Sequence, residues 1–287
     1  MESHELSLSS RFGRKTAIMF RQITSAIRVL PSFIIFGAPR CGTTSLYNYL
    51  IEHPSIVPAL SKEIGFFELN YYKGISWYKL FFPTFLSKFQ IKKEFRNEFI
   101  TGEATANYIH HPCVAERIKK NLPNVKLIVL LRNPVDRAYS QYYKLVKLGR
   151  EELSFEDAIA IEPERIKGET EKMIQNDDYY SLKYHNFSYL SGGIYVDKLK
   201  KWFEIFPKEQ ILVLRSEDFY EKPSLIYETT LEYLNLRKWK LKEYLKYNYY
   251  ADQQKIGESI RKQLIEFFKP HNERLYRFLD RDFGWNN

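Results

Sequence analysis

The feature that most constrains the fold is the stretch at residues 33–50, FIIFGAPRCGTTSLYNYL. Its first five residues form a short apolar run, which predicts a buried strand of a parallel sheet. A glycine-bearing turn follows, and the hydroxyl residues after it are typical of the start of a helix. A strand, a turn and a helix in this order bring unpaired amides and the positive end of a helix dipole together. The turn therefore predicts an anion-binding loop.

This turn offers an anion several kinds of donor. Gly42 lets the backbone approach closely, and Arg40 adds a permanent charge with a fork suited to phosphate or sulfate oxygens. Hydroxyl side chains add further donors. We predict that the anion is bound by Arg40, Cys41, Gly42, Thr43, Thr44 and Ser45. The structural alternative is a tight strand-to-helix turn without a ligand.

The loop differs from that of proteins that hydrolyse ATP or GTP. Gly37 and Gly42 have the separation of the motif G-x-x-x-x-G-K-[ST], but Thr43 stands where the motif has lysine. The apolar run KLIVLL ends in Arg132, where a metal-binding aspartate would be expected. The sequence therefore disfavours nucleotide hydrolysis with Mg²⁺. No Cys/His cluster has the spacing of metal ligands, so we predict no metal site.

A second segment, LLRNPVDRAYSQYY, supports the same kind of site. Arg132 ends a predicted strand, and Ser140 lies eight residues later in the next helix. Because ligands bind at the carboxyl ends of parallel strands, we expect both side chains to reach one phosphate beside the glycine loop. In the alternative, Arg132 pairs with Asp136 and Ser140 faces solvent.

Strands and helices alternate along the chain. A strand that runs into a loop is predicted over 99–109. Further strands are predicted over 125–132 and 210–219, and helices over 43–54, 113–124, 134–150 and 194–207. This alternation predicts an α/β fold in which helices flank a central, mostly parallel sheet on both faces. By length the chain could form one large domain or two small ones. The polar segment from about 150 to 190 reads as a helical insertion or a mobile loop over the site.

The chain carries 44 basic and 35 acidic residues, a net charge of +9, which favours an anionic partner. Charge alone does not choose between a nucleotide, a polyanionic sugar, a nucleic acid and a membrane surface. Arg21 and Arg28 interrupt the apolar residues of the basic extension 1–31, so no integral membrane segment is expected. The basic, amphipathic pattern of residues 11–30 predicts a surface helix that packs on the domain. The alternative is a segment that contacts a membrane surface. Two cysteines indicate a reducing compartment, and we expect a cytoplasmic location.

Together these segments resemble the sulfotransferases that use 3′-phosphoadenosine 5′-phosphosulfate (PAPS). GAPRCGTTSLYNYL is similar to the family's 5′-phosphosulfate loop, and LIVLLRNPVDRAYSQY to its 3′-phosphate strand and helix. KEIGFFELNYYKGISWYKLFFP and the C-terminal FFKPHNERLYRFLDRDFGW resemble the heparan sulfate N- and 3-O-sulfotransferase branch, including its bacterial members. The resemblance covers residues 32–287, so we predict a sulfotransferase domain there and leave residues 1–31 outside it.

The resemblance implies a single α/β domain, PAPS as the donor, adenosine 3′,5′-bisphosphate (PAP) as the product, and no metal. It places the catalytic base at Glu63, and the 3′-phosphate at Arg132 and Ser140, with Arg40 beside the leaving group. A base must take the proton of the attacking hydroxyl or amine, while cations stabilise the charge on the sulfuryl oxygens and leaving phosphate. On the residues alone, Glu63 also reads as a surface glutamate paired with a lysine.

The chain departs from the family at three positions. Arg40 stands where many relatives have lysine, and arginine stays charged and does not deliver a proton. Gly65 replaces the histidine of the 3-O branch, so no acid–base role is expected there. Ala104 replaces a lysine that glycan-modifying enzymes often carry, which weakens the inference of a sulfated polysaccharide acceptor. Lys255 is a candidate for closing the 3′-phosphate site.

We therefore predict a PAPS-dependent sulfotransferase that acts on a hydroxyl or amine of a small molecule or glycan, and no nucleic-acid partner. Two alternatives stay open: a catalytically inactive polyanion-binding protein of the same fold, and a P-loop kinase of small molecules. Neither the acceptor nor the oligomeric state follows from the sequence, because the cleft above the donor determines the acceptor.

Overall fold

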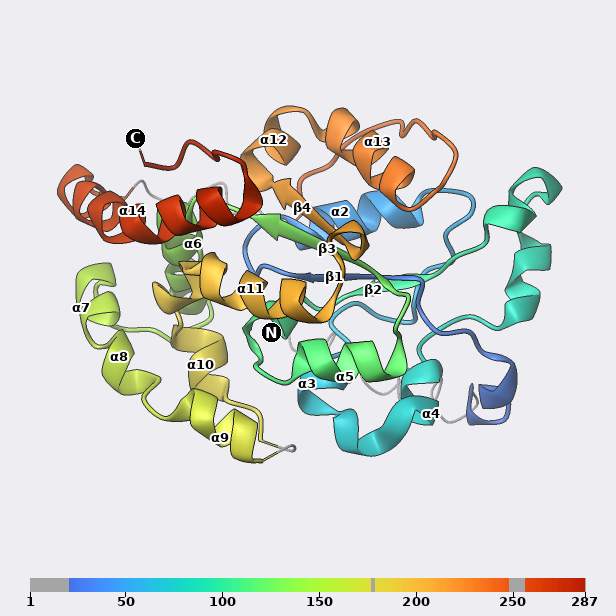
Figure 1. The fold of residues 1–287 in the computed structure, drawn as a ribbon, viewed down its shortest axis with the longest axis horizontal. Coiled ribbons are helices and arrows are strands. Elements are labelled where there is room, and N and C mark those ends of the chain that lie inside the picture. The colour runs from blue at the N-terminus through green and yellow to red at the C-terminus, as the bar shows by residue number, and fades with distance from the viewer. Residues whose placement is uncertain (1–20, 177–178, 248–255, 287) are drawn as a thin grey trace.

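The computed structural model describes residues 21–176, 179–247 and 256–286. Its centre is a sheet of four strands in the order β2-β1-β3-β4, and every pair of neighbours is parallel (Figure 1). The strands are β1 (Phe33–Gly37), β2 (Gly102–Ala104), β3 (Lys126–Leu131) and β4 (Ile211–Arg215). The predicted α/β fold with a central parallel sheet is confirmed.

Burial explains why these segments form strands. All five residues of β1 and all three of β2 are buried, and β3 is buried after its first residue. The strand predicted over 210–219 is too long, because residues 216–219 belong to the helix α12 (Ser216–Glu221). In the predicted strand-to-loop segment 99–109, the strand β2 occupies three residues. After β2 the backbone amide of Tyr108 bonds to the carbonyl of Thr105, so the chain turns into the short 3₁₀ helix η5 (Ala106–His110).

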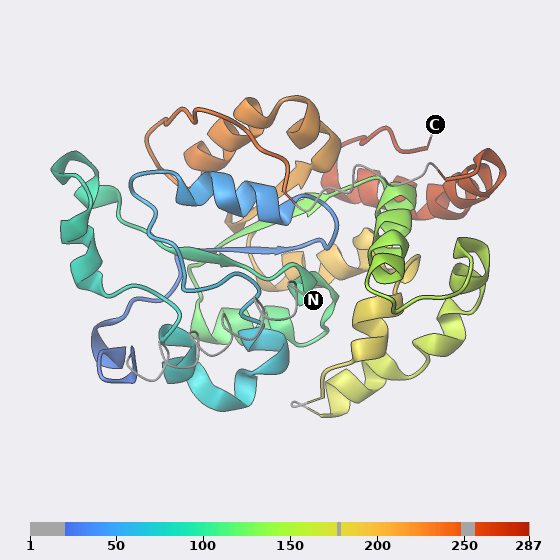
Figure 2. The same ribbon diagram turned by 180° about the vertical axis from the view of Figure 1, so that it is seen from behind.

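Helices cover both faces of the sheet, as predicted (Figures 1 and 2). One face carries α2 (Thr43–Ile51), α12 (Ser216–Glu221) and α13 (Pro223–Tyr233), and the other carries α5 (Val114–Asn121) and α11 (Tyr195–Ile205). Trp202 of α11 stacks on Phe36 of β1 with 4.0 Å between ring centroids. Such contacts between large apolar side chains hold the layers together.

A further group of helices lies beyond the carboxyl ends of the strands. α6 (Pro134–Lys147) begins just after β3, and the polar segment that follows forms α7 (Phe155–Ala160), α8 (Glu162–Arg165), α9 (Glu169–Gln175) and α10 (Leu182–Phe187) (Figure 2). The helical reading of residues 150–190 is therefore confirmed. α14 (Glu258–Leu279) packs against α6 and α11.

The remaining elements are short. They are α3 (Phe66–Leu69), α4 (Gly74–Lys79), η1 (Ser25–Ile27), η2 (Tyr71–Lys73), η3 (Phe85–Gln90), η4 (Lys93–Glu98), η6 (Ser191–Gly193) and η7 (Lys208–Gln210). In the N-terminal extension, the guanidinium groups of Arg21 and Arg28 both donate to the carbonyl of Phe82, so residues 21–30 pack on the domain. No helix within the described ranges has the length and apolarity to cross a bilayer.

Candidate active site

The loop between β1 and α2 has the conformation that an anion site needs. Arg40 and Gly42 lie in the left-handed region, with φ of 70° and 93°, and Gly42 is the N-cap of α2. A Cβ atom at Gly42 would stand 3.1 Å from the hydroxyl of Tyr220 and 3.2 Å from the ring of Phe219. The backbone angle therefore favours glycine, and a Cβ atom would also be tightly packed. Since glycine has no side chain to cap α2, its first turn suits an anion.

Arg40 joins this loop to α6. Its Nε donates a 3.0 Å hydrogen bond to Oγ of Ser140, and Nη1 of Arg132 donates a 3.3 Å bond to the Arg40 carbonyl. Ser140 is buried, and Asp136 forms its ion pair with Arg261. The alternative, in which Arg132 pairs with Asp136 and Ser140 faces solvent, is therefore wrong.

The other loop residues have different surroundings. Cys41 is fully buried, its carbonyl accepts a 2.7 Å bond from Oγ of Ser216, and burial raises the pKa of its thiol. Its side chain therefore faces the core, and only its backbone is placed to meet a ligand. Oγ of Ser45 accepts a 3.0 Å bond from the amide of Tyr247. Thr43 is buried and Thr44 half-buried at the start of α2.

Glu63 lies beyond the carboxyl end of β2. Its amide donates to the carbonyl of Ala104 (2.9 Å), and its Oε2 accepts from the amide of Ala106 (3.1 Å). Its Oε1 is 2.5 Å from Nζ of Lys62, and 45% of its side chain is exposed. One backbone bond thus fixes the main chain of Glu63 and one orients its carboxylate, and the other carboxylate oxygen is paired with a lysine, as the sequence alternative expected. A carboxylate that remains half exposed is accessible to an acceptor.

Two further carboxyl groups, which no sequence motif marks, lie behind Glu63. Glu103 is fully buried and accepts hydrogen bonds from Tyr78, Tyr108 and Thr105. Burial raises its pKa to about 7. Burial also raises the pKa of Glu68 to about 8, and repulsion by Glu63 and Glu103 adds to that shift. Glu103 follows Gly102 in the predicted strand, so its place at a strand end was the available signal.

Tyr220 is a third residue that the sequence did not single out. Its hydroxyl lies beside Gly42. Burial raises its pKa, and the nearby charges of Arg132 and Arg40 oppose that rise. No motif marks this tyrosine, because it reaches the loop from α12, far away in the sequence. It brings a third hydroxyl-bearing element to the site, after α2 and α6.

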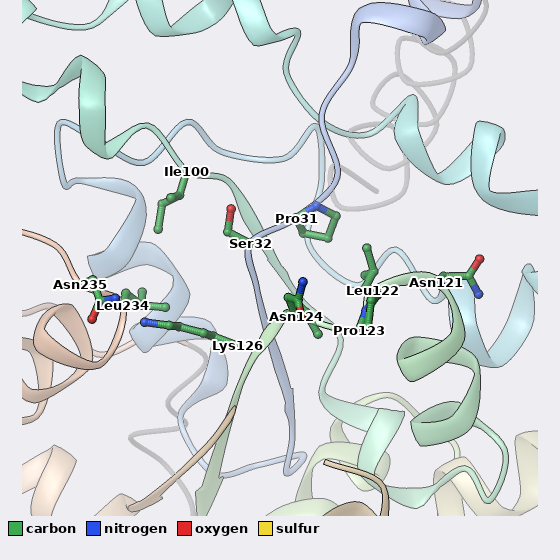
Figure 3. Close-up of a pocket in the computed structure, with 11 residues that line it drawn as sticks. Pro31, Ser32, Ile100, Asn121, Leu122, Pro123, Asn124, Lys126, Leu234 and Asn235 are labelled. Carbon is green, nitrogen blue, oxygen red and sulfur yellow. The ribbon is translucent and has the colours of Figure 1, made fainter. Parts of the chain in front are cut away.

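Several cavities lie in the described part of the chain. A cavity of about 280 Å³ shares His110, His111 and Tyr184 with a smaller one that reaches Glu68. A cavity of about 440 Å³ lies at the opposite edge of the sheet, where Ser32 and Lys126 mark the amino ends of β1 and β3 (Figure 3). This cavity is therefore distant from the glycine loop, Glu63 and Arg132, which lie at the carboxyl ends of the strands.

Two remaining predictions concern metals and Lys255. Within the residues that the structure describes, no group of three His, Cys, Asp or Glu side chains could hold a metal ion. Lys255 lies outside the described residues.

Comparison with known proteins gives the family. The family model described as a sulfotransferase domain matches residues 30–281, so the chain belongs to the sulfotransferase family. The crystal structure of a sulfotransferase from Alicyclobacillus acidocaldarius superposes with a TM-score of 0.68 at 28% identity. The match covers 90% of this chain and 100% of that one. The expected family and its fold are confirmed.

Three curated relatives give the level of similarity. The membrane-associated sulfotransferase kil1 of Dictyostelium discoideum is 30% identical, over 90% of this chain and 67% of its own. The bifunctional heparan sulfate N-deacetylase/N-sulfotransferase 1 of Caenorhabditis elegans is 27% identical over 93% of this chain. Heparan sulfate glucosamine 3-O-sulfotransferase 3B1 of Mus musculus is 26% identical over 90%. The chain spans 32% of the second relative's length and 65% of the third's.

Proposed function

We propose that the protein transfers a sulfuryl group from PAPS to a hydroxyl or amine of an acceptor, with Glu63 as the base. The observation that carries this proposal is the hydrogen-bonded chain from Arg132 through the Arg40 carbonyl and the Arg40 guanidinium to Ser140. Two permanent cations and a hydroxyl converge there beside the uncapped start of α2. This donor set suits two anionic groups of one ligand.

The donor residues have distinct roles in this proposal. The loop 40–45 holds the 5′-phosphosulfate end, and Arg132 and Ser140 hold the 3′-phosphate. When bound, PAPS supplies an activated sulfuryl group. Arg40 is a permanent charge at the leaving phosphate, where it stabilises negative charge without giving up a proton.

Glu63 accepts the proton of the acceptor. The bond from the amide of Ala106 orients its carboxylate, and Lys62 holds the other oxygen. The half-exposed side chain can therefore meet an alcohol or amine that enters from solvent. Because two of the relatives are named for heparan sulfate, we propose a glycan acceptor, and the nine excess positive charges suit an anionic one.

The direct test is transfer from sulfur-labelled PAPS to a panel of acceptors. The panel contains heparan sulfate, its N-deacetylated form, a neutral glycan, a lipid alcohol and a phenol. The expected result is labelled glycan, formed without Mg²⁺. Tight glycan binding with no transfer to any acceptor would favour the inactive polyanion-binding alternative. Mg²⁺-dependent phosphate transfer from ATP would favour the kinase.

A further inference from the structure

Lys144 lies on α6, one helical turn beyond Ser140. Ser140 and Gln141 are buried on the inward face of this helix, and Lys144 is half-buried at the edge of that face. Side chains of a helix lean toward its N-terminus and cover the preceding turn. The Lys144 side chain therefore extends toward Ser140 and toward the guanidinium that Ser140 binds.

Charged groups from four other segments surround Lys144. Repulsion comes from Arg40 in the glycine loop and from Lys62 and Arg150, and attraction comes from Glu63. On α10, the charge of Lys144 in turn acts on His185. The ammonium group is therefore within electrostatic reach of both the loop that we assign to the phosphosulfate and the carboxylate that we assign as the base.

The ammonium group of Lys144 makes no hydrogen bond or ion pair with any residue in the described ranges, although the lysine is half-buried. The neighbouring cations of this site differ in that respect, because Arg40 bonds to Ser140 and Lys62 pairs with Glu63. A half-buried charge without such a partner has lost part of its contact with water and gained no bond within the protein. An anion bound between Arg40 and Glu63 would compensate that loss.

We propose that Lys144 is a further catalytic residue, whose ammonium contacts the sulfuryl group in transit between Arg40 and Glu63. This inference rests on the function proposed above. In the transfer, the acceptor oxygen or nitrogen forms a bond to sulfur while the bond from sulfur to the 5′-phosphate oxygen breaks. The electron pair of the broken bond goes to that phosphate oxygen, and the acceptor's proton goes to Glu63. Lys144 keeps its proton and stabilises the charge on the oxygens around sulfur.

Such a lysine would complement the arginine of the loop. Arg40 is held by Ser140 and by the conformation of its own backbone, whereas a lysine is a mobile point charge with three donors. Burial lowers the pKa of Lys144, and Arg40 lowers it further. The positive charge should therefore be lost at a lower pH than that of an exposed lysine, and activity that needs the charge should fall with it.

The experiment compares Lys144→Met, Lys144→Arg and the control Lys147→Met, which changes an exposed lysine of the same helix. We expect Lys144→Met to lower kcat by about a hundredfold, with little change in acceptor KM or in PAP affinity. Lys144→Arg should recover part of the activity, and the alkaline limb of its pH profile should move to higher pH. Lys147→Met should behave as the parent protein.

Two results would overturn the proposal. Unchanged kcat in Lys144→Met would remove Lys144 from the reaction, and a raised acceptor KM with normal kcat would reduce it to an acceptor-binding residue. Retained PAP binding in the variant shows that it is folded.

A binding measurement separates this inference from the proposed function. If the parent protein transfers no sulfate, the proposed function fails, and affinities for PAPS and PAP still test the contact. We expect Lys144→Met to weaken PAPS binding by about tenfold, because one hydrogen bond to a charged group is lost, and to leave PAP binding unchanged. Equal effects on the two nucleotides would contradict a contact with the sulfuryl group.

Discussion

Nε of Arg40 donates a 3.0 Å hydrogen bond to Oγ of Ser140, across 100 positions of sequence. The two residues come from different strand-to-helix connections, β1 to α2 and β3 to α6. β1 and β3 are neighbours in the sheet, so their carboxyl ends place both connections at one edge. The bond, together with that from Arg132 to the Arg40 carbonyl, makes the two halves of the proposed donor site one unit.

Replacing Arg132 by alanine should weaken binding of PAP far more than binding of adenosine 5′-phosphosulfate. The guanidinium would pair with the 3′-phosphate, which only PAP carries, and charge-assisted bonds of this kind contribute about 1.5–3 kcal/mol. Calorimetric titration with both nucleotides measures the difference. Arg277→Ala, on the exposed side of α14, is the control for loss of a surface charge. Equal losses of affinity for both nucleotides would contradict a contact between Arg132 and the 3′-phosphate.

Glu63→Gln should lower turnover by about a hundredfold while PAP binding stays close to normal, because glutamine keeps the shape but not the basicity. Steady-state rates with labelled PAPS give turnover, and titration gives affinity. Glu209→Gln changes an exposed glutamate at the amino end of β4 and should have no effect. If Glu63→Gln retains full turnover, another group takes the proton.

Gly42→Ala should destabilise the protein and abolish donor binding. The alanine would adopt a left-handed conformation at a cost of about 1–2 kcal/mol, and its Cβ would press on Tyr220 and Phe219. Gly149→Ala is a matched control, since its φ is 63° and no atom lies within 4 Å of the added Cβ. Urea unfolding should show a larger loss in the free energy of unfolding for Gly42→Ala than for Gly149→Ala. Similar losses in the two variants would mean that the loop adjusts its conformation to accept the added Cβ.

The buried carboxyl of Glu68 should make stability depend on pH. Its folded pKa of about 8 lies above its ordinary value of 4.5, so between these values the folded state binds more protons than the unfolded state. The free energy of unfolding therefore falls as pH rises from about 4.5 to 8.

Glu68→Gln removes this titration. Between pH 5 and 8 the variant should lose less of its free energy of unfolding than the parent protein, by on the order of a few kcal/mol. Urea unfolding at several pH values measures the difference. Glu209→Gln should follow the parent curve, and a parallel curve for Glu68→Gln would show that Glu68 does not hold its proton in the folded state.

Several features could be predicted from local sequence. The four strands and the helices α2, α5, α6 and α11 were predicted because continuous apolar runs and helix starts are local patterns. The loop residues and the placement of Arg132 and Ser140 at one sheet edge followed from strand ends. The fourth strand was predicted too long, because residues 216–219 begin the helix α12. The division at residue 32 and the cytoplasmic location stay predictions.

The sequence by itself determined the α/β class, the glycine loop and the family, because these depend on short segments whose residue types are constrained locally. Only the tertiary structure decided that Arg40 bonds to Ser140, that Glu68 and Glu103 lie buried behind Glu63, and that Lys144 lies among the charges of Arg40 and Glu63. Those relationships join residues from separate segments. They arise only when the sheet brings the strand ends together and burial excludes water from the groups between them.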